Sequence, residues 1–107
     1  MIIGAIMAVA MTDFVPPKNW RTFGIAIQTC GTWTAHKREN GWARTGDYHW
    51  MSGYLSGINL ANGGNITGPV DVEAAVAYVD KYCAENPLDQ VALVVGFLTS
   101  DLYKRSE

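Results

Sequence analysis

The two cysteines, Cys30 and Cys83, are the residues whose chemistry matters most, and they lie far apart in the sequence. Three arrangements are open: a metal site, two free buried thiols, or a disulfide. A metal site is disfavoured because no CxxC pair occurs and because His36 and His49 lack the spacing of metal ligands. A disulfide is favoured if the chain is exported, since oxidising compartments preserve such bonds. A bridge closing about 53 residues would stabilise the fold by about 4 kcal/mol.

Catalytic groups are not evident in the sequence. A reactive cysteine needs a nearby base and an exposed, electropositive setting, but Cys83 falls on an apolar stripe, and His36 does not share a helical face with Cys30. Capping and solvation explain the positions of the carboxylates Asp47, Asp71, Glu73, Asp80, Glu85, Asp89 and Asp101. The stretch GGNITG lacks the preceding strand and the lysine of a phosphate loop. We therefore expect no catalytic residue, no metal, no cofactor and no enzymatic activity.

Aromatic residues crowd one part of the chain, with Trp33, Trp42, Trp50 and Tyr54 close together. Their large apolar area predicts that most of them lie in the core. Trp42 lies in ENGWARTG, which reads as a loop, so it is either an exposed interface anchor or a lid packed on the core.

We predict a protein-binding surface formed by two loops. Tryptophan and arginine are the residue types most often found as interface anchors. Its residues are Trp42 and Arg44 in the first loop and Asn62, Asn65 and Thr67 in the second.

The composition indicates one compact domain. The 107 residues are 49% apolar and 17% charged, with a formal net charge of −2. No basic run is longer than the pair Lys37 and Arg38, so nucleic-acid binding is not expected. No apolar stretch reaches the length of about 18 residues that a membrane span needs. A protein partner is expected, and a homodimer stays open.

The N-terminal run MIIGAIMAVA is apolar and ends in Ala8-Val9-Ala10, which resembles a signal cleavage site but follows no basic region. Residues 1–21 are therefore either a leader remnant or an extended N-terminal arm, and residues 22–107 are the helical domain. The leader interpretation predicts export to the periplasm. The Pro16-Pro17 pair predicts an extended connector.

Residue periodicity predicts the elements of the first half. The period of two in Phe23, Ile25 and Ile27 predicts a short strand or extended segment over 22–29. A short helix follows from Cys30 to about Glu39 and ends at Asn40-Gly41. A second helix is expected over 45–62, its apolar stripe formed by Trp50, Tyr54, Gly57, Ile58 and Ala61. Gly53 and Gly57 on this stripe suggest helix packing in which another backbone approaches closely.

Two further helices complete the prediction. Pro69 and Asp71 mark the start of a third helix whose inner face is Val72, Ala75, Val76, Val79 and Cys83. The last helix is expected to begin at Asn86 as N-cap with Pro87 following. Its buried stripe is Val91, Val94, Val95, Leu98 and Leu102. The expected fold is thus an all-α, single-domain bundle of about four helices with a short extended N-terminal segment.

The stretches CGTW, WMSGYLSGIN and YVDKYCAENP, followed by a final amphipathic helix, resemble the Rap/Tai immunity-protein family of the HdeA-like superfamily. The resemblance covers about residues 29–103. It implies a small periplasmic all-α protein in which Cys30 and Cys83 form a disulfide. Members of that family bind and block a peptidoglycan amidase delivered by type VI secretion, whereas HdeA-like relatives are acid-stress chaperones.

The expected function is therefore that of a small periplasmic protein that inhibits or neutralises a partner enzyme, with a peptidoglycan amidase effector as the expected class of partner. The alternatives are an HdeA-like acid-stress chaperone and a phage or mobile-element module that binds a host protein. With two histidines and ten acidic residues, nothing in the composition marks an acid sensor.

Overall fold

The structure is a computed structural model that describes residues 14–107. This part of the chain contains a 3₁₀ turn, η2 (Gly24–Ile27), and four α-helices, which are α2 (Cys30–Glu39), α3 (Trp42–Ala61), α4 (Val72–Glu85) and α5 (Val91–Ser106). The predicted all-α fold is confirmed. None of the described helices combines the length and the apolarity that crossing a membrane requires.

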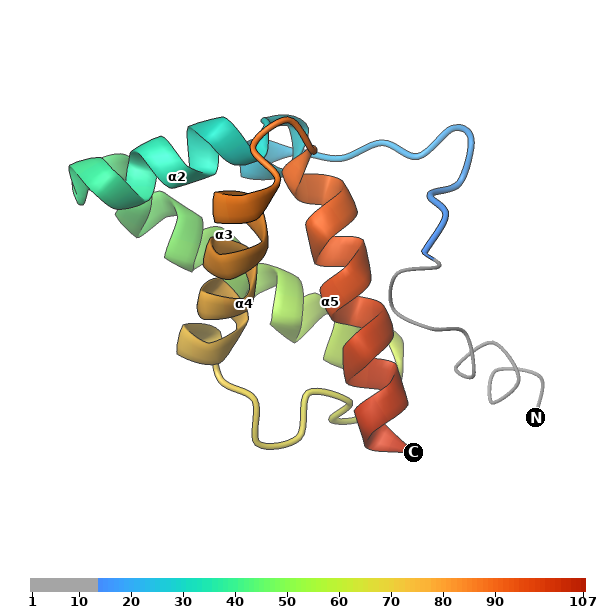
Figure 1. Cartoon of the computed structure of the whole chain (residues 1–107). Coiled ribbons are helices and arrows are strands. Elements are labelled where there is room, and N and C mark those ends of the chain that lie inside the picture. The colour runs from blue at the N-terminus through green and yellow to red at the C-terminus, as the bar shows by residue number, and fades with distance from the viewer. Residues whose placement is uncertain (1–13) are drawn as a thin grey trace.

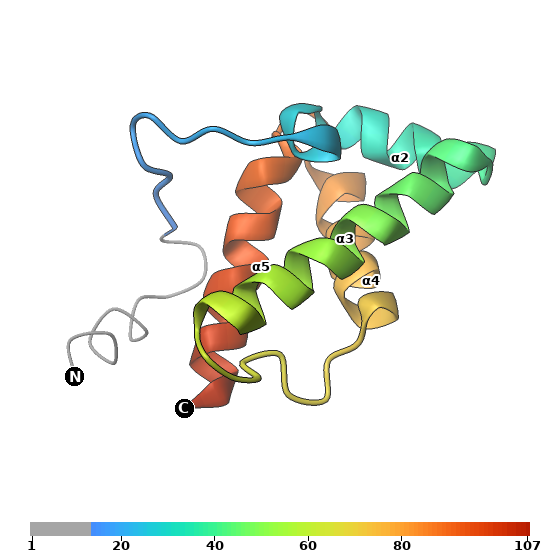
Figure 2. The same ribbon diagram turned by 180° about the vertical axis from the view of Figure 1, so that it is seen from behind.

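The helices enclose one core. Helices α4 and α5 lie side by side, α2 lies across their upper ends, and the extended N-terminal segment leaves from the same end (Figure 1). Seen from behind, α3 runs diagonally across the pair, and the loop between α3 and α4 lies at the end opposite to α2 (Figure 2). Trp33, Met51, Val79, Val94 and Leu98 are among the side chains that fill the space between the helices.

The disulfide between Cys30 and Cys83 is present, so the prediction of a bridge is confirmed. It joins the first residue of α2 to the last turn of α4, and both cysteines are fully buried. Helix α2 has the predicted bounds, and Asn40 ends it in the left-handed conformation, with φ of 54°. Helix α4 begins as predicted, with the Asp71 carboxylate accepting a hydrogen bond from the Ala74 amide (2.9 Å).

The predicted start of the last helix at Asn86 is wrong, because α5 begins at Val91. The turn over residues 86–90 instead provides hydrogen-bond acceptors for α2. Its Asp89 carbonyl accepts a hydrogen bond from the Cys30 amide (2.7 Å), and its Pro87 carbonyl accepts one from Gly31 (2.9 Å). These two amides lie at the N-terminus of α2, where no partner exists within the helix. The turn therefore caps α2 from a distant part of the sequence.

Helix α3 differs from its prediction in start and in register. It begins at Trp42, and its buried residues are Arg44, Asp47, Met51 and Leu55. The predicted stripe is displaced by about one position, since Trp50 and Tyr54 are half-buried and Ala61 is exposed. The spacing of apolar residues does not indicate the buried face correctly, because the charged residues Arg44 and Asp47 occupy inward positions of this helix.

The predicted close packing at Gly53 and Gly57 is not found among residues 14–107. Both glycines are exposed, and a Cβ atom added to either would meet no atom within 4 Å among the described residues. At these two positions the outer surface of α3 carries no side chain, but no other backbone of the described fold approaches it there.

Residues 22–29 do not form the predicted strand. The central four residues are the 3₁₀ turn η2, and Thr29 forms an isolated β-bridge with Gln90. Gly24 has φ of +69°, and a Cβ there would lie 2.8 Å from Cδ1 of Trp50. The Trp50 indole also donates a hydrogen bond to the Phe23 carbonyl (3.1 Å). The turn is therefore shaped by contact with α3, and only glycine fits at its first position.

The predicted leader or arm, residues 1–21, is described only in part, since residues 1–13 lie outside the described region. Phe14, the first described residue, contacts the helical body. The Phe14 ring packs edge-on against Phe97 of α5, at a centroid distance of 6.3 Å, and a Cβ at Gly96 would collide with it.

Candidate functional site

Arg44, predicted as part of an interface, is instead the centre of a buried polar cluster. Its Nη1 and Nη2 donate hydrogen bonds to Oδ1 and Oδ2 of Asp80 (2.9 and 2.8 Å). The Trp33 indole donates a third hydrogen bond to Oδ1 of Asp80 (2.7 Å). The guanidinium lies over the rings of Trp33 and Tyr48, and only 7% of Arg44 is exposed. The cluster joins α2, α3 and α4, so the prediction of Arg44 as a partner-binding residue is wrong.

The charges in this cluster support one another. Burial alone would raise the pKa of Asp80, but the hydrogen bonds from Arg44 and Trp33 and the charges of Arg44 and Lys37 outweigh burial, so its pKa lies below the ordinary value. For Arg44, burial would lower the pKa, yet the hydrogen bond and the charge of Asp80 raise it. Both residues are therefore held in their ionised forms, as a bidentate pair requires.

Trp42, in contrast, projects into solvent. It is the first residue of α3 and is 91% exposed. The alternative that it packs on the core as a lid is therefore wrong. Ala43, its neighbour, lines a surface groove that is described below.

The second predicted loop lies at the opposite end of α3. A helix of 20 residues spans about 30 Å, so Trp42 is distant from Asn62, Asn65 and Thr67. That loop is held internally: the Asn59 side chain accepts hydrogen bonds from the amides of Ile66 (2.9 Å) and Thr67 (3.3 Å). Thr67 is buried and donates to the Asn65 side chain (2.8 Å). The structure therefore does not bring the two predicted loops together as one surface.

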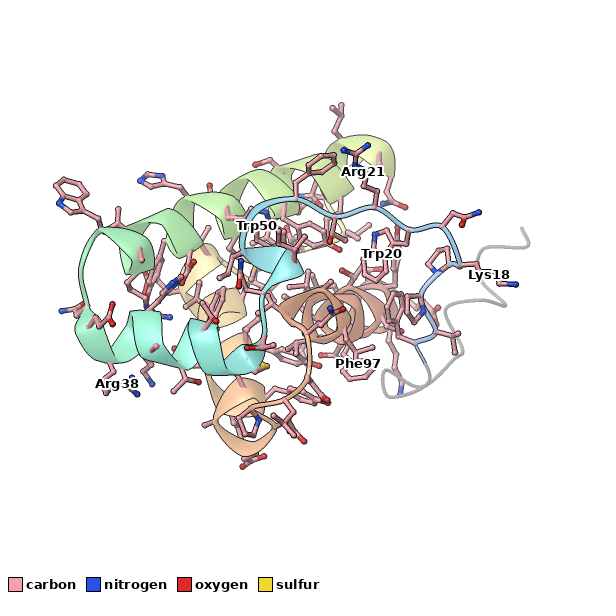
Figure 3. All side chains as sticks on the ribbon, turned by 90° about the horizontal axis from the view of Figure 1, so that it is seen from above. Lys18, Trp20, Arg21, Arg38, Trp50 and Phe97 are labelled. Atoms are coloured by element: carbon pink, nitrogen blue, oxygen red, sulfur yellow. A yellow bond between two sulfur atoms is a disulfide. The ribbon has the colours of Figure 1, made fainter. Side chains whose placement is uncertain are left out.

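A groove of about 660 Å³ lies between α2, α3 and η2, and we call it the α2–α3 groove. Its lining residues are Gly24, Ile25, Ile27, Gln28, Thr32, His36, Ala43, Gly46, Asp47 and Trp50. Figure 3 views the molecule from the side where these elements meet, with Trp50 next to the η2 turn and Arg38 on α2 pointing away. A Cβ at Gly46 would meet no atom within 4 Å among the described residues, so this glycine keeps the groove open.

The polar part of the groove is a pair formed by His36 of α2 and Asp47 of α3. His36 Nδ1 donates a hydrogen bond to Oδ2 of Asp47 (2.8 Å). Burial raises the pKa of Asp47 above its ordinary value, and the hydrogen bond and charge of His36 offset this only in part. When Nδ1 donates to the carboxylate, Nε2 of a neutral imidazole is a hydrogen-bond acceptor. It has no hydrogen-bond partner among the described residues.

An imidazole oriented by a carboxylate can act as a general base if a nucleophile lies within hydrogen-bond reach. Both cysteines are engaged in the disulfide. Within residues 14–107, no hydroxyl group forms a hydrogen bond with His36, and no group of three or more His, Cys, Asp or Glu side chains could hold a metal ion. The arrangement is therefore suited to accepting a hydrogen bond from a bound group.

Sequence reasoning missed the roles of Asp80, Asp47 and His36. Asp80 follows the buried Val76 by four positions, and Asp47 precedes the buried Met51 by four. Charged residues at helical spacing from apolar positions, with opposite charges on two helices, are the signal that could have revealed the buried pairs.

Comparisons of the chain with protein-family models, with curated proteins and with solved structures found no match.

Proposed function

We propose that this protein binds a partner protein in the periplasm and inhibits it, as immunity proteins of the Rap/Tai type do with peptidoglycan amidases. The observation that carries the proposal is the open α2–α3 groove, with the exposed Trp42 directly before its lining residue Ala43. A groove of this volume accepts several side chains of a partner loop, and an exposed tryptophan one residue before a lining residue is a suitable anchor.

The framework around the groove supports this function. The disulfide joins α2 to α4, and the Arg44–Asp80 pair joins α3 to α4, so both helices that line the groove are fixed to the same third helix. A surface that is already ordered before binding loses little conformational entropy when the partner docks. The disulfide also agrees with a location in an oxidising compartment such as the periplasm.

The role of the groove can be tested by filling it. Gly46→Met places a flexible side chain in the groove, whereas Gly57→Met places the same side chain on the exposed surface of the same helix, outside the groove. Both variants should be at least as stable as the wild type, because a helical glycine costs up to about 1 kcal/mol relative to a good helix former.

The assay expresses each variant in the periplasm together with a peptidoglycan amidase effector of type VI secretion, and measures cell lysis. We expect the wild type and Gly57→Met to protect the cells and Gly46→Met to fail. Equal protection by both variants would show that the groove is not the inhibitory surface. If neither the wild type nor any variant protects, the amidase tested is not the partner.

Trp42 provides a second test of the same surface. We expect Trp42→Ala to weaken partner binding by at least about 2 kcal/mol, while its melting temperature stays close to that of the wild type, since the ring buries little area in the free protein. Calorimetric titration and thermal unfolding measure the two quantities. Unchanged binding would remove Trp42 from the interface.

An acid-stress chaperone is the second candidate, and the Asp80 cluster is the observation that favours it. Protonation of this single carboxylate on α4 removes the charge that pairs with Arg44 of α3 and Lys37 of α2. If the protein acts in this way, acid should expose apolar surface, seen as dye binding, and the protein should then suppress aggregation of denatured client proteins. Retention of the native state without client protection at pH 2–3 would exclude this candidate.

A further inference from the structure

A second surface pocket, which we call the aromatic pocket, lies between the extended segment, α3 and α5. Its walls include Trp20, Phe23, Trp50 and Tyr54, and Val95 contributes to its lining from α5. Trp50 and Tyr54 are stacked, with ring centroids 5.3 Å apart. Phe23 is 66% and Trp20 is 40% exposed, so the pocket presents aromatic surface to solvent. Figure 3 shows Trp20 and Arg21 on the extended segment and Trp50 on α3, around the same side of the molecule.

The size of the pocket limits what it can hold. Its volume is about 220 Å³. Sites for whole small molecules usually measure about 300–1,000 Å³, so this pocket is suited to one side chain rather than to a complete ligand. It is separate from the α2–α3 groove, although Trp50 lines both.

Two polar groups of the pocket are already engaged within the fold, which disfavours a strongly hydrogen-bonding occupant such as a sugar. The Trp50 indole already donates to the Phe23 carbonyl, and the Tyr54 hydroxyl is hydrogen-bonded to Thr99. Hydroxyl groups brought against the Trp50 and Tyr54 rings would lose water without gaining hydrogen bonds from these two residues. An apolar side chain avoids this cost and gains contact with the aromatic rings.

The charge at the pocket is positive. Arg21 lines it, with its guanidinium 5.2 Å from the centroid of the Phe23 ring. Arg21 forms no ion pair among the described residues, and none of the described residues that line the pocket is acidic. A cationic ligand would be repelled here, in contrast to aromatic cages that bind ammonium groups.

We propose that the aromatic pocket binds an apolar side chain flanked by carboxylates, in an acidic segment of a protein partner. The side chain enters between Trp20, Phe23 and Trp50, and a neighbouring carboxylate pairs with Arg21. This site is additional to the α2–α3 groove and does not depend on the partner being an enzyme.

The four tryptophans of the chain provide the readout, because each gives its own indole N–H signal in a ¹H–¹⁵N NMR spectrum. The probe is a capped pentapeptide with a central phenylalanine between two aspartates, added to the full chain at millimolar concentration. We expect the signals of Trp20 and Trp50 to shift and those of Trp33 and Trp42 to stay. Two matched peptides, one with lysines in place of the aspartates and one with alanine in place of the phenylalanine, should bind at least about threefold more weakly.

Arg21→Glu tests the charge, and Lys18→Glu is its control, since Lys18 lies on the same extended segment but does not line the pocket. We expect Arg21→Glu to weaken binding of the aspartate peptide at least about threefold and to improve binding of the lysine peptide, whereas Lys18→Glu changes either by less than about twofold. An unchanged Trp33 signal shows that the variants keep the native core.

Several outcomes would overturn the proposal. If the lysine peptide binds as well as the aspartate peptide, the argument from charge is wrong. If the alanine peptide binds as well as the phenylalanine peptide, the argument from the apolar side chain is wrong. Stronger shifts of the Trp20 and Trp50 signals with tetramethylammonium or N-acetylglucosamine would identify a different class of ligand. Movement of these signals on dilution of the protein alone would show that a second copy of the chain occupies the pocket. No shift with the aspartate peptide would show that the pocket does not bind it.

Discussion

Replacement of Asp80 by asparagine tests the buried polar cluster most directly. The substitution preserves the shape of the side chain but removes the charge that faces Arg44, Trp33 and, at 3.8 Å, Lys37. The Arg44 guanidinium is almost completely buried and would lose its carboxylate partner. Breaking a buried pair in this way typically costs about 3–5 kcal/mol, because one charge remains without compensation.

We expect a loss at the lower end of that range, about 3 kcal/mol, because the asparagine oxygen can still accept the hydrogen bond of the Trp33 indole. For a domain of this size, that loss lowers the melting temperature by about 12–24 °C. It is also a large fraction of the stability of about 5–15 kcal/mol that such domains have. Urea unfolding followed by circular dichroism gives the change in free energy of unfolding.

A double-mutant cycle separates the pair from general effects of substitution. Arg44→Met removes the cation, and the variant that combines it with Asp80→Asn contains neither charge. We expect the double variant to be less destabilised than the sum of the two single variants, by at least about 1 kcal/mol. Additive losses, or a loss below about 1 kcal/mol for Asp80→Asn alone, would refute the account of Arg44 and Asp80 as a coupled buried pair.

The same cluster makes the stability depend on acid. Because the pKa of Asp80 in the folded protein lies below the ordinary value of 3.8, its contribution is fully present above that pH. The contribution is lost as the pH falls from about 3.8 through the lower pKa of the folded state. The stability of Asp80→Asn should lack this component, so the difference between wild type and variant should shrink as the pH is lowered through this range.

Three further predictions follow from the structure. Reduction of the disulfide between Cys30 and Cys83 should lower the stability by about 4 kcal/mol. Mass spectrometry checks the reduction and thermal unfolding checks the loss of stability. A loss smaller than about 1 kcal/mol would contradict the proposed constraint on the unfolded chain. Asp47→Asn should leave the stability at pH 7 unchanged or raise it, in contrast to Asp80→Asn. Because the pKa of Asp47 is raised in the folded protein, its protonated carboxyl contributes stability below pH 3.8, and this contribution is lost as the pH rises through the raised pKa. An asparagine stays neutral and therefore keeps the contribution at pH 7. A clear loss of stability in urea unfolding at pH 7 would show that the charged pair with His36 is required. Gly57→Leu should stabilise α3 by up to about 1 kcal/mol because the position is helical and exposed, and a loss above about 2 kcal/mol would restore the close packing that the sequence suggested.

The elements whose pattern is local could be predicted from the sequence. Helix α2 ends at Asn40-Gly41, α4 begins at Asp71, and the apolar faces of α4 and α5 have the expected residues. Each of these features depends on capping residues or on spacing within one helix, which the chain carries irrespective of its neighbours. The choice of a disulfide was also correct, because two isolated cysteines offered few alternatives.

The features that depend on contacts between distant residues could not be predicted in the same way. The Asn86–Gln90 turn has the sequence of a helix start, yet its carbonyls accept hydrogen bonds from the N-terminus of α2. The register of α3 was misread because Arg44 and Asp47 look like surface residues and are buried only by their partners on other helices. Burial of a charge is favourable only when its partner is in place, and one helix alone does not contain that information.

In the candidate site, too, some features can be read from the sequence and others depend on the tertiary structure. The sequence by itself determined that Trp42 is an unusual tryptophan in a glycine-flanked stretch, and that no motif for metal or phosphate binding is present. Only the tertiary structure decided that Trp42 is exposed, that Arg44 is not, and that His36 and Asp47 meet in a groove between two helices. A groove exists only between packed elements, so the way α2, α3 and η2 meet, and not the residues of any one of them, determines where this groove lies.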